Sequence, residues 1–357
     1  MKIIFQCRQN LHQLSGGDKI QILKTKEFLE KAGVEVRIST TAHPDLRGVD
    51  IFHLFNPSLL SLQPITDCKR KGVPVAISTI HWDMKEYYES IFAINKEYFR
   101  LKPRGYIPYY LKNQALALFY NCWWYRKSMR NLKKIFELGD VLLPNSRAEE
   151  NLLKKQFGLS DKKFFVIPNG VDHHILSSSD LFYQKYKIKD FILCAARLEY
   201  RKNQLQFLKG MMKNNLPIVF IGNNKFNKGY TALCKKLADA RGDVLFIDHI
   251  NQEYLFSAYI NARVHVLPSW YETPGLSSLE AGAAGCNIVV SDRGSTREYF
   301  QDYAEYCDPV DPDSIRRSVI TAYGNKRNSR LQGHILNHYT WHNAMNATLA
   351  AYRSILG

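Results

Sequence analysis

The chain has 357 residues, of which 45% are hydrophobic and 23% charged, and its formal net charge is +16 at pH 7. This length predicts two domains rather than one hydrophobic core, and no run of the sequence reaches the roughly 18 to 20 apolar residues that a membrane-spanning helix requires. The positive charge predicts an anionic partner, which composition leaves open between nucleic acid, a membrane surface and a phosphorylated substrate.

The N-terminal sequence MKIIFQCRQNLHQ has neither the apolar region nor the small-residue cleavage site of a secretory signal, so we expect a cytoplasmic protein. The seven cysteines include no Cys-x-x-Cys pair. That pattern favours reduced thiols over a disulfide framework or a zinc site, as in a reducing compartment.

The first half of the chain alternates strand and helix patterns. An apolar strand at 2–5 leads through the Gly16-Gly17 pair into an amphipathic helix from about 18 to 32. The glycine pair allows a ligand to approach the backbone at a helix N-terminus, although it lacks the spacing of a G-x-G-x-x-G dinucleotide motif. Short apolar runs bounded by turn residues predict further buried strands at 34–38, 49–55, 73–79, 140–146 and 163–170.

A basic and aromatic segment interrupts this alternation. Residues 100–134 contain no acidic side chain, and lysines and arginines alternate there with tyrosines, tryptophans and a phenylalanine. Such a segment suits the headgroup layer of an anionic membrane, which would make the protein peripheral to the inner face of that membrane. A solvated basic helix whose aromatic side chains pack inward explains the same pattern.

The second half repeats the alternation of strands and helices. Strands are predicted at 190–197, 216–222, 243–248, 262–269 and 287–292, and helices near 203–214, 228–241, 252–262 and 277–284. Alternating elements of this kind predict an α/β protein with two doubly wound, Rossmann-like domains that face a central cleft. We expect one domain at 1–175, completed by a C-terminal helix at 341–357, and the other at 176–340.

The sequence PSWYETPGLSSLEAGAAG, residues 268–285, follows a predicted strand and carries two glutamates, Glu272 and Glu280. Glu272 is expected at the carboxyl end of that strand, and the backbone amides of Gly275, Leu276 and Ser277 at the start of the next helix, where they can bind a phosphate. Glu280 either contacts the same ligand or completes a capping box with Ser277.

A second cluster, AARLEYRKNQ, follows the strand predicted at 190–197. It delivers Arg197 and Lys202 to a loop at the carboxyl end of that strand. Two cations there can neutralise a pyrophosphate, whereas single cations are often merely solvated.

In order along the chain, the motifs SGGDK, PNGVD, ARLEYRKN and PSWYETPGLSSLEAGAAG resemble glycosyltransferase family 4, a family of retaining enzymes with the GT-B fold. The resemblance covers most of the chain and is best from about 140 to 300. Its most specific part is the pair of glutamates with seven residues between them, combined with Arg197 and Lys202 upstream.

The resemblance implies a metal-independent, hexosyltransferase-type enzyme with a nucleotide-sugar donor as substrate and no cofactor. It implies that Glu272 and the amides near Gly275 hold the donor sugar and diphosphate, that Glu280 binds the ribose, and that Arg197 and Lys202 stabilise the departing diphosphate. His81, in STIHWD, falls where many members place a histidine near the donor sugar, although a histidine satisfied within the core is an equal reading.

Three positions depart from the family pattern. The usual Glu-Gly-Phe-Gly is Glu272-Thr-Pro-Gly275, the usual Gly-Arg-Leu is Ala196-Arg197-Leu198, and Asn287 replaces a proline. These departures concern the identity of the donor sugar, because the charged positions and Gly275 remain.

Members of the family with a basic, aromatic N-terminal domain often extend lipid-linked glycans. We therefore expect a saccharide or lipid-linked acceptor and a role in bacterial surface polysaccharide synthesis (O-antigen, capsule or lipopolysaccharide). Two other classes compete. A nucleic-acid-binding protein would explain the charge, but the sequence has no recognised nucleic-acid-binding motif. We therefore expect no nucleic acid as a partner. A nicotinamide-dependent oxidoreductase would share the alternation of elements, but it should carry the glycine motif.

Overall fold

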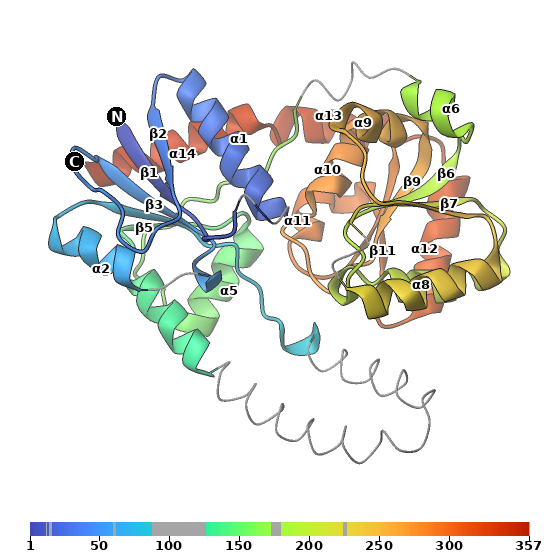
Figure 1. Ribbon diagram of the computed structural model, residues 1–357, viewed down its shortest axis with the longest axis horizontal. Coiled ribbons are helices and arrows are strands. Elements are labelled where there is room, and N and C mark those ends of the chain that lie inside the picture. Colours follow the sequence, from blue (N-terminus) through green and yellow to red (C-terminus); the bar gives the residue numbers. More distant parts are fainter. Residues whose placement is uncertain are drawn as a thin grey trace, which may run out of the picture. The chain divides into compact units, whose positions relative to one another are not determined.

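The computed structural model describes all residues except 12, 14–15, 60–61, 88–125, 173–179, 224–226 and 357. The chain divides into two compact units (Figure 1). Unit 1 comprises Met1–Ile167 together with Met345–Gly357, and unit 2 comprises Pro168–Ala344. Unit 2 is therefore an insertion in the sequence of unit 1, and the last helix of the chain returns to the unit in which the chain begins.

Unit 1 is built on a five-stranded parallel sheet with the order β2-β1-β3-β4-β5. Its strands are β1 (Lys2–Gln6), β2 (Glu35–Ser39), β3 (Ile51–Phe55), β4 (Val75–Ser78) and β5 (Val141–Leu143). Its helices are α1 (Gly17–Lys31), η1 (Pro57–Leu59), α2 (Gln63–Arg70), α5 (Arg147–Phe157) and α14 (Trp341–Leu356), with further helical residues at 126–138. The strand order reverses at β1, as in doubly wound folds.

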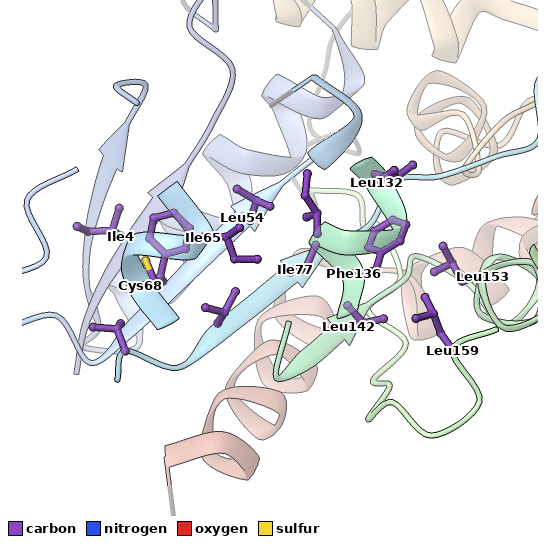
Figure 2. Close-up of a cluster of buried hydrophobic side chains, with 14 of the residues drawn as sticks. Ile4, Leu54, Ile65, Cys68, Ile77, Leu132, Phe136, Leu142, Leu153 and Leu159 are labelled. Carbon is purple, nitrogen blue, oxygen red and sulfur yellow. The ribbon is translucent and has the colours of Figure 1, made fainter. Parts of the chain in front are cut away.

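The central strands of unit 1 are apolar because helices cover both faces of the sheet. Every residue of β3, β4 and β5 is buried. Leu54 and Ile77 contribute to a cluster with Ile65 of α2 and with Phe136 (Figure 2). On β3, His53 precedes Leu54 and hydrogen-bonds the Tyr352 hydroxyl of α14 at 2.6 Å. Alternation along β3 thus directs adjacent side chains to helices on opposite faces.

The strand expected at 163–170 does not form. This segment makes one isolated bridge, between Phe164 and Leu142 of β5. Leu142 donates to the Lys163 carbonyl at 2.9 Å and accepts from the Phe165 amide at 3.0 Å. The next donor on the β5 side would be residue 144, and Pro144 has no N–H. Beyond the bridge, the Pro144 carbonyl still accepts from the Ile167 amide at 2.8 Å, but without the second hydrogen bond no regular ladder forms.

Unit 2 is built on a six-stranded parallel sheet with the order β11-β10-β9-β6-β7-β8. Its strands are β6 (Phe191–Ala195), β7 (Ile218–Ile221), β8 (Val244–Ile247), β9 (Ala262–Leu267), β10 (Asn287–Ser291) and β11 (Glu305–Cys307). This order is that of the dinucleotide-binding Rossmann sheet. Its topological switch point lies between β6 and β9, and ligands of such sheets bind beyond the carboxyl ends of the strands at that point.

The helices of unit 2 begin in two ways. They are α6 (Leu181–Tyr186), η4 (Tyr200–Lys202), α7 (Gln204–Gly210), η5 (Met211–Lys213), α8 (Lys228–Arg241), α9 (Gln252–Asn261), α10 (Leu276–Ala283), α11 (Thr296–Phe300), η6 (Gln301–Tyr303), α12 (Pro312–Gly324) and α13 (Ser329–His338). Asparagine or aspartate side chains cap the N-termini of α8, α9, α12 and α13. The N-caps of α6, α7, α10 and α11 make no such bond, and that of α10 is Gly275, which has no side chain to make one.

Most of the basic and aromatic segment at 100–134 lies outside the described residues, which resume at 126. From 126 to 134 the chain is helical, and its basic side chains Arg126, Lys127, Arg130, Lys133 and Lys134 are exposed, while Leu132 is buried. None of the helices in the described part of the chain combines the length and apolar character needed to cross a membrane.

Candidate active site

The candidate site lies at the switch point of the unit 2 sheet. The loop after β6 and the loop after β9 leave neighbouring strands at their carboxyl ends. The first loop carries Arg197 and Lys202, and the second carries Glu272. The two loops are joined directly, because the Trp270 amide donates to the Arg201 carbonyl at 2.9 Å. The sequence analysis placed these charged residues at two strand ends, and the sheet order makes those ends adjacent.

Glu272 accepts hydrogen bonds from two cations of the other loop. The Lys202 ammonium contacts Glu272 Oε1, and Arg201 Nη1 donates to the same oxygen at 3.2 Å. The side chains of Glu272 and Lys202 are only 7% and 13% exposed. A buried carboxylate is stable only when such partners compensate for its lost hydration. The structure thus brings together two of the residues predicted from sequence, Lys202 and Glu272.

The predicted Arg197 joins this cluster through two residues that the sequence analysis did not single out. Arg197 Nη2 lies 3.3 Å from Glu199 Oε1, and Arg201 Nη2 lies 3.1 Å from the same oxygen. Arg201 also donates to Glu272, so cations and carboxylates alternate along one chain of contacts. Glu199 and Arg201 lie within ARLEYRKN, but only the turn of η4 shows that both face this cluster.

The pKa values of the central pair reflect the balance between burial and charge. Burial alone would raise the pKa of Glu272, but the charges of Lys202 and Arg201 outweigh it, so this pKa is lowered. The pKa of Lys202 is lowered by burial and by Arg201, against the opposing effect of Glu272. Below the loops, burial lowers the pKa of His265 to about 3, so that its imidazole is neutral.

Helix α10 begins with an uncapped turn beside this cluster. Gly275 has φ +88°, a conformation that favours glycine, and a Cβ there would lie 3.0 Å from Leu267 Cδ2. It follows a cis peptide bond between Thr273 and Pro274. The amides of Leu276 and Ser277 precede the first intrahelical hydrogen bonds, and the N-cap supplies no side-chain acceptor. This is the geometry that binds anions at helix N-termini.

The capping-box reading of Glu280 is wrong. That reading needs Ser277 as the N-cap, but α10 begins at Leu276, so Ser277 lies inside the helix. The Glu280 carboxylate instead accepts a hydrogen bond from the Tyr259 hydroxyl of α9 at 3.0 Å. Glu280 is partly exposed and Tyr259 fully buried.

The other predicted residues belong to unit 1. His81 is 6% exposed, and its Nε2 hydrogen-bonds Gln156 Oε1 at 2.7 Å. Its ring packs against Phe157 with centroids 5.1 Å apart, and its pKa is lowered by burial. Of the two readings that the sequence left open for His81, the structure supports the histidine satisfied within the core.

Gly16 is the N-cap of α1, and Gly17 is the first residue of that helix. A Cβ at Gly16 would lie 2.7 Å from Asp18 Oδ1. Asp18 is paired with the nearly buried Arg8, whose Nε donates to Asp18 Oδ2 at 2.7 Å. The glycine pair therefore follows β1 and opens α1, as expected from its place in the sequence.

Sequence comparison identifies two matching families. The profile described as "Glycosyltransferase Family 4" matches residues 41–174, and the profile described as "Glycosyl transferases group 1" matches residues 179–333. Together these ranges cover most of both units.

Curated relatives match about half of the chain. An uncharacterized glycosyltransferase of Methanocaldococcus jannaschii is 30% identical over 173 residues, 45% of this chain and 44% of its own. The Campylobacter jejuni N-acetylgalactosamine-N,N'-diacetylbacillosaminyl-diphospho-undecaprenol 4-alpha-N-acetylgalactosaminyltransferase is 27% identical, over 47% of this chain and 46% of its own. The O-antigen chain mannosyltransferase B of Escherichia coli is 25% identical, over 48% of each chain. The chain thus spans about half the length of these relatives.

Solved structures match over nearly the whole chain. Sucrose-phosphate synthase from Thermosynechococcus elongatus superposes with a TM-score of 0.76 at 14% identity, covering 99% of this chain and 98% of that one. HepE of Anabaena, solved in complex with UDP and glucose, gives a TM-score of 0.74 at 14% identity, covering 99% and 100%. These likenesses establish the GT-B fold, with two parallel-sheet α/β domains.

Proposed function

Because the chain belongs to glycosyltransferase family 4, we propose that it is a retaining, hexosyltransferase-type enzyme that moves a sugar from a nucleotide-sugar donor to a glycan or lipid-linked glycan. Family membership sets aside the two competing classes, a nucleic-acid-binding protein and a nicotinamide-dependent oxidoreductase. The observation that carries the proposal is the cluster of Lys202, Glu272 and Arg201 beside the uncapped start of α10.

This cluster suits the diphosphate of a donor. Lys202 and Arg201 are held in place by one carboxylate, so no reorganisation is needed when a diphosphate arrives. Arg197, at 30% side-chain exposure, is the most accessible of the three cations. The amides of Leu276 and Ser277 add the positive end of a helix dipole. In the proposal Glu272 and these amides also hold the donor sugar, and Glu280 contacts the ribose.

The reaction breaks the bond between the anomeric carbon and the diphosphate oxygen, and it forms a bond from the same carbon to an acceptor oxygen. Positive charge develops on the sugar and negative charge on the departing diphosphate. Preorganised donors at that diphosphate are each worth about 3 kcal/mol of barrier. We propose attack from the face that the diphosphate leaves, with the acceptor proton passing to a donor phosphate oxygen. No protein nucleophile is then needed, and the configuration is retained.

Three of the sequence-predicted residues have a reduced place in this scheme. We propose that His81 has a structural rather than a catalytic role, because its Nε2 is hydrogen-bonded to Gln156. Gly16 and Gly17 stay a prediction for donor binding. We also propose that the enzyme works without a metal, since Arg197, Arg201 and Lys202 supply the positive charge. Turnover that is unchanged by EDTA would support this point, and loss of turnover restored by Mg²⁺ would contradict it.

The first experiment identifies the nucleotide. Thermal shift with UDP, GDP, dTDP and ADP, followed by their sugar conjugates, should raise the melting temperature for one nucleoside diphosphate. A Lys202→Ala variant should lose that shift, because the ammonium contacts the diphosphate. NAD serves as the control ligand. Stabilisation by NAD but by none of the diphosphates would contradict the proposal.

The acceptor is proposed to be a lipid-linked glycan in bacterial surface polysaccharide synthesis. Two relatives support this: one is named for a diphospho-undecaprenol acceptor and the other for the O-antigen chain. The exposed lysines and arginines of residues 126–134 would contact anionic headgroups. Flotation with vesicles of anionic and of neutral lipid should recover the protein with the anionic vesicles at low salt. Equal recovery with both kinds would contradict membrane contact through charge.

A further inference from the structure

Tyr259 lies behind Glu280 in the interior of unit 2. It is a residue of α9, and its side chain is fully buried. Its hydroxyl donates to Glu280 Oε2 at 3.0 Å. Glu280 belongs to the neighbouring helix α10 and is partly exposed. The pair therefore connects a buried donor to a carboxylate that solvent or a ligand can reach.

Tyr259 is held in place by contacts of its ring and of its backbone. Its ring packs edge to face on His265 of β9, with centroids 5.9 Å apart and planes at 70°. The backbone carbonyl of Tyr259 accepts from Cys286 Sγ at 2.8 Å. Burial and the Glu280 charge raise the pKa of the phenol well above its usual value of 10, so the hydroxyl is a donor throughout the physiological range. A donor in so fixed a place gives Glu280 a defined carboxylate orientation.

An ionised carboxylate has about four acceptor sites on its two oxygens. The hydrogen bond from Tyr259 to Glu280 Oε2 fills one of these sites and orients the group. Because Ser277 does not cap α10, helix capping supplies no reason for a carboxylate at position 280.

We propose that Tyr259 is a positioning residue that holds Glu280 in the orientation in which it accepts hydrogen bonds from the ribose hydroxyls of the donor nucleotide. This inference rests on the proposed function, in which Glu280 contacts the ribose. Tyr259 itself touches no substrate. It acts by fixing the carboxylate, and it favours a ribonucleotide over a 2′-deoxyribonucleotide.

The test compares ribose and deoxyribose ligands on the full chain. UDP, GDP and ADP, each with its 2′-deoxy counterpart, are titrated calorimetrically, and the tightest pair is used for all variants. We expect the wild type to prefer the ribonucleotide by about 10-fold, the value of one well-placed hydrogen bond to a charged group. Tyr259→Phe should reduce this preference to about 3-fold or less. The ratio of the two affinities does not depend on the folded fraction of a sample, so partial misfolding does not spoil the test.

Two further variants are needed to assign a change in this ratio to Tyr259 and Glu280. Tyr352→Phe is the matched control, because Tyr352 is fully buried and its hydroxyl contacts His53 in unit 1. It should leave the ratio unchanged. Glu280→Gln should reduce the ratio at least as far as Tyr259→Phe does.

An unchanged ratio in Tyr259→Phe, together with a reduced ratio in Glu280→Gln, would overturn the role of Tyr259 and leave the proposed function standing. Equal affinity for both sugars in the wild type, or an unchanged ratio in Glu280→Gln, would instead remove the ribose contact itself. Equal weakening of both ligands in Tyr259→Phe would show that the residue is merely structural, and it would overturn the inference too.

Discussion

The spacing Ser-x-x-Glu occurs at the start of α5 in unit 1 and at the start of α10 in unit 2. The serine caps the helix in α5 but not in α10. In α5, Ser146 is the N-cap and its hydroxyl accepts from the Glu149 amide at 3.0 Å. Glu149 is completely buried and accepts from the Asn145 amide at 2.8 Å. In α10 the N-cap is Gly275, and Ser277 and Glu280 lie inside the helix.

The difference separates a structural helix start from one suited to a ligand. At the start of α5, Ser146 satisfies the Glu149 amide and the Glu149 carboxylate satisfies the Asn145 amide, so an anion has less to gain there. The start of α10 has no side-chain cap, and it adjoins the cluster of Lys202, Glu272 and Arg201. An identical spacing in sequence thus indicates function only when the helix boundary is known.

The largest expected effect tests the ligand side of this comparison. Lys202→Ala should lower turnover about 100-fold or more, because a charged donor at the departing diphosphate is lost. Lys154→Ala is the matched control, since Lys154 of α5 also pairs with a buried carboxylate, Glu150, at 2.7 Å. It should leave turnover within about 2-fold. Steady-state kinetics measures both variants, and circular dichroism checks their folding. Near-normal turnover in Lys202→Ala would remove the proposed mechanism.

The next effect tests the structural side. Glu149→Gln should lower the free energy of unfolding by about 2 kcal/mol, because one acceptor oxygen becomes an NH₂ donor that faces other donors. Thr79 Oγ1 and the amides of His81 and Asn145 all donate to this carboxylate. Urea denaturation measures the loss, and nucleotide affinity should stay unchanged. A variant that keeps its stability but loses nucleotide binding would place Glu149 in the functional site instead.

A pair of serine variants compares the two helix starts directly. Ser146→Ala should cost about 1 kcal/mol of stability because it removes an N-cap. Ser277→Ala should cost less than about 0.5 kcal/mol, because Ser277 caps nothing. Thermal and urea unfolding of both variants gives the difference. Equal losses of stability in the two variants would mean that Ser277 caps its helix as Ser146 does.

The smallest effect concerns His81, whose main-chain amide also donates to Glu149, at 2.8 Å. His81→Gln should change turnover by less than about 3-fold, because the buried side chain contacts Gln156 and phenylalanine rings. The kinetic assay used for Lys202→Ala serves here. A loss of about 100-fold without loss of stability would return His81 to the catalytic group.

The sequence predicted the parallel sheets and the strand ends that carry Arg197, Lys202 and Glu272, because buried parallel strands are short apolar runs bounded by turn residues. It did not predict that Arg201 joins Glu199 to Glu272. Side-chain partners across two loops depend on strand order, and only the sheet shows that β6 and β9 are neighbours.

Local sequence patterns gave a wrong or an open prediction where the backbone of one or two residues determined the structure. Apolar character favoured a strand at 163–170, but Pro144, which follows β5, has no N–H to donate, so the segment makes a single bridge instead of a ladder. The alternatives for Glu280 could not be decided from spacing, because the start of α10 shifts by only two residues between the capped and the uncapped form.

The insertion of unit 2 into unit 1 has a practical consequence for dissecting the molecule. The Val171 amide donates to the Tyr339 carbonyl at 2.8 Å, and a Cβ at Gly170 would lie 2.2 Å from the Thr340 carbonyl carbon, so the two ends of unit 2 touch. Residues 168–344 could therefore be expressed as one uninterrupted fragment and assayed for nucleotide binding alone. Unit 1 would need a short artificial linker between residues 167 and 345, because simple truncation after Ile167 would remove Tyr352, which hydrogen-bonds His53.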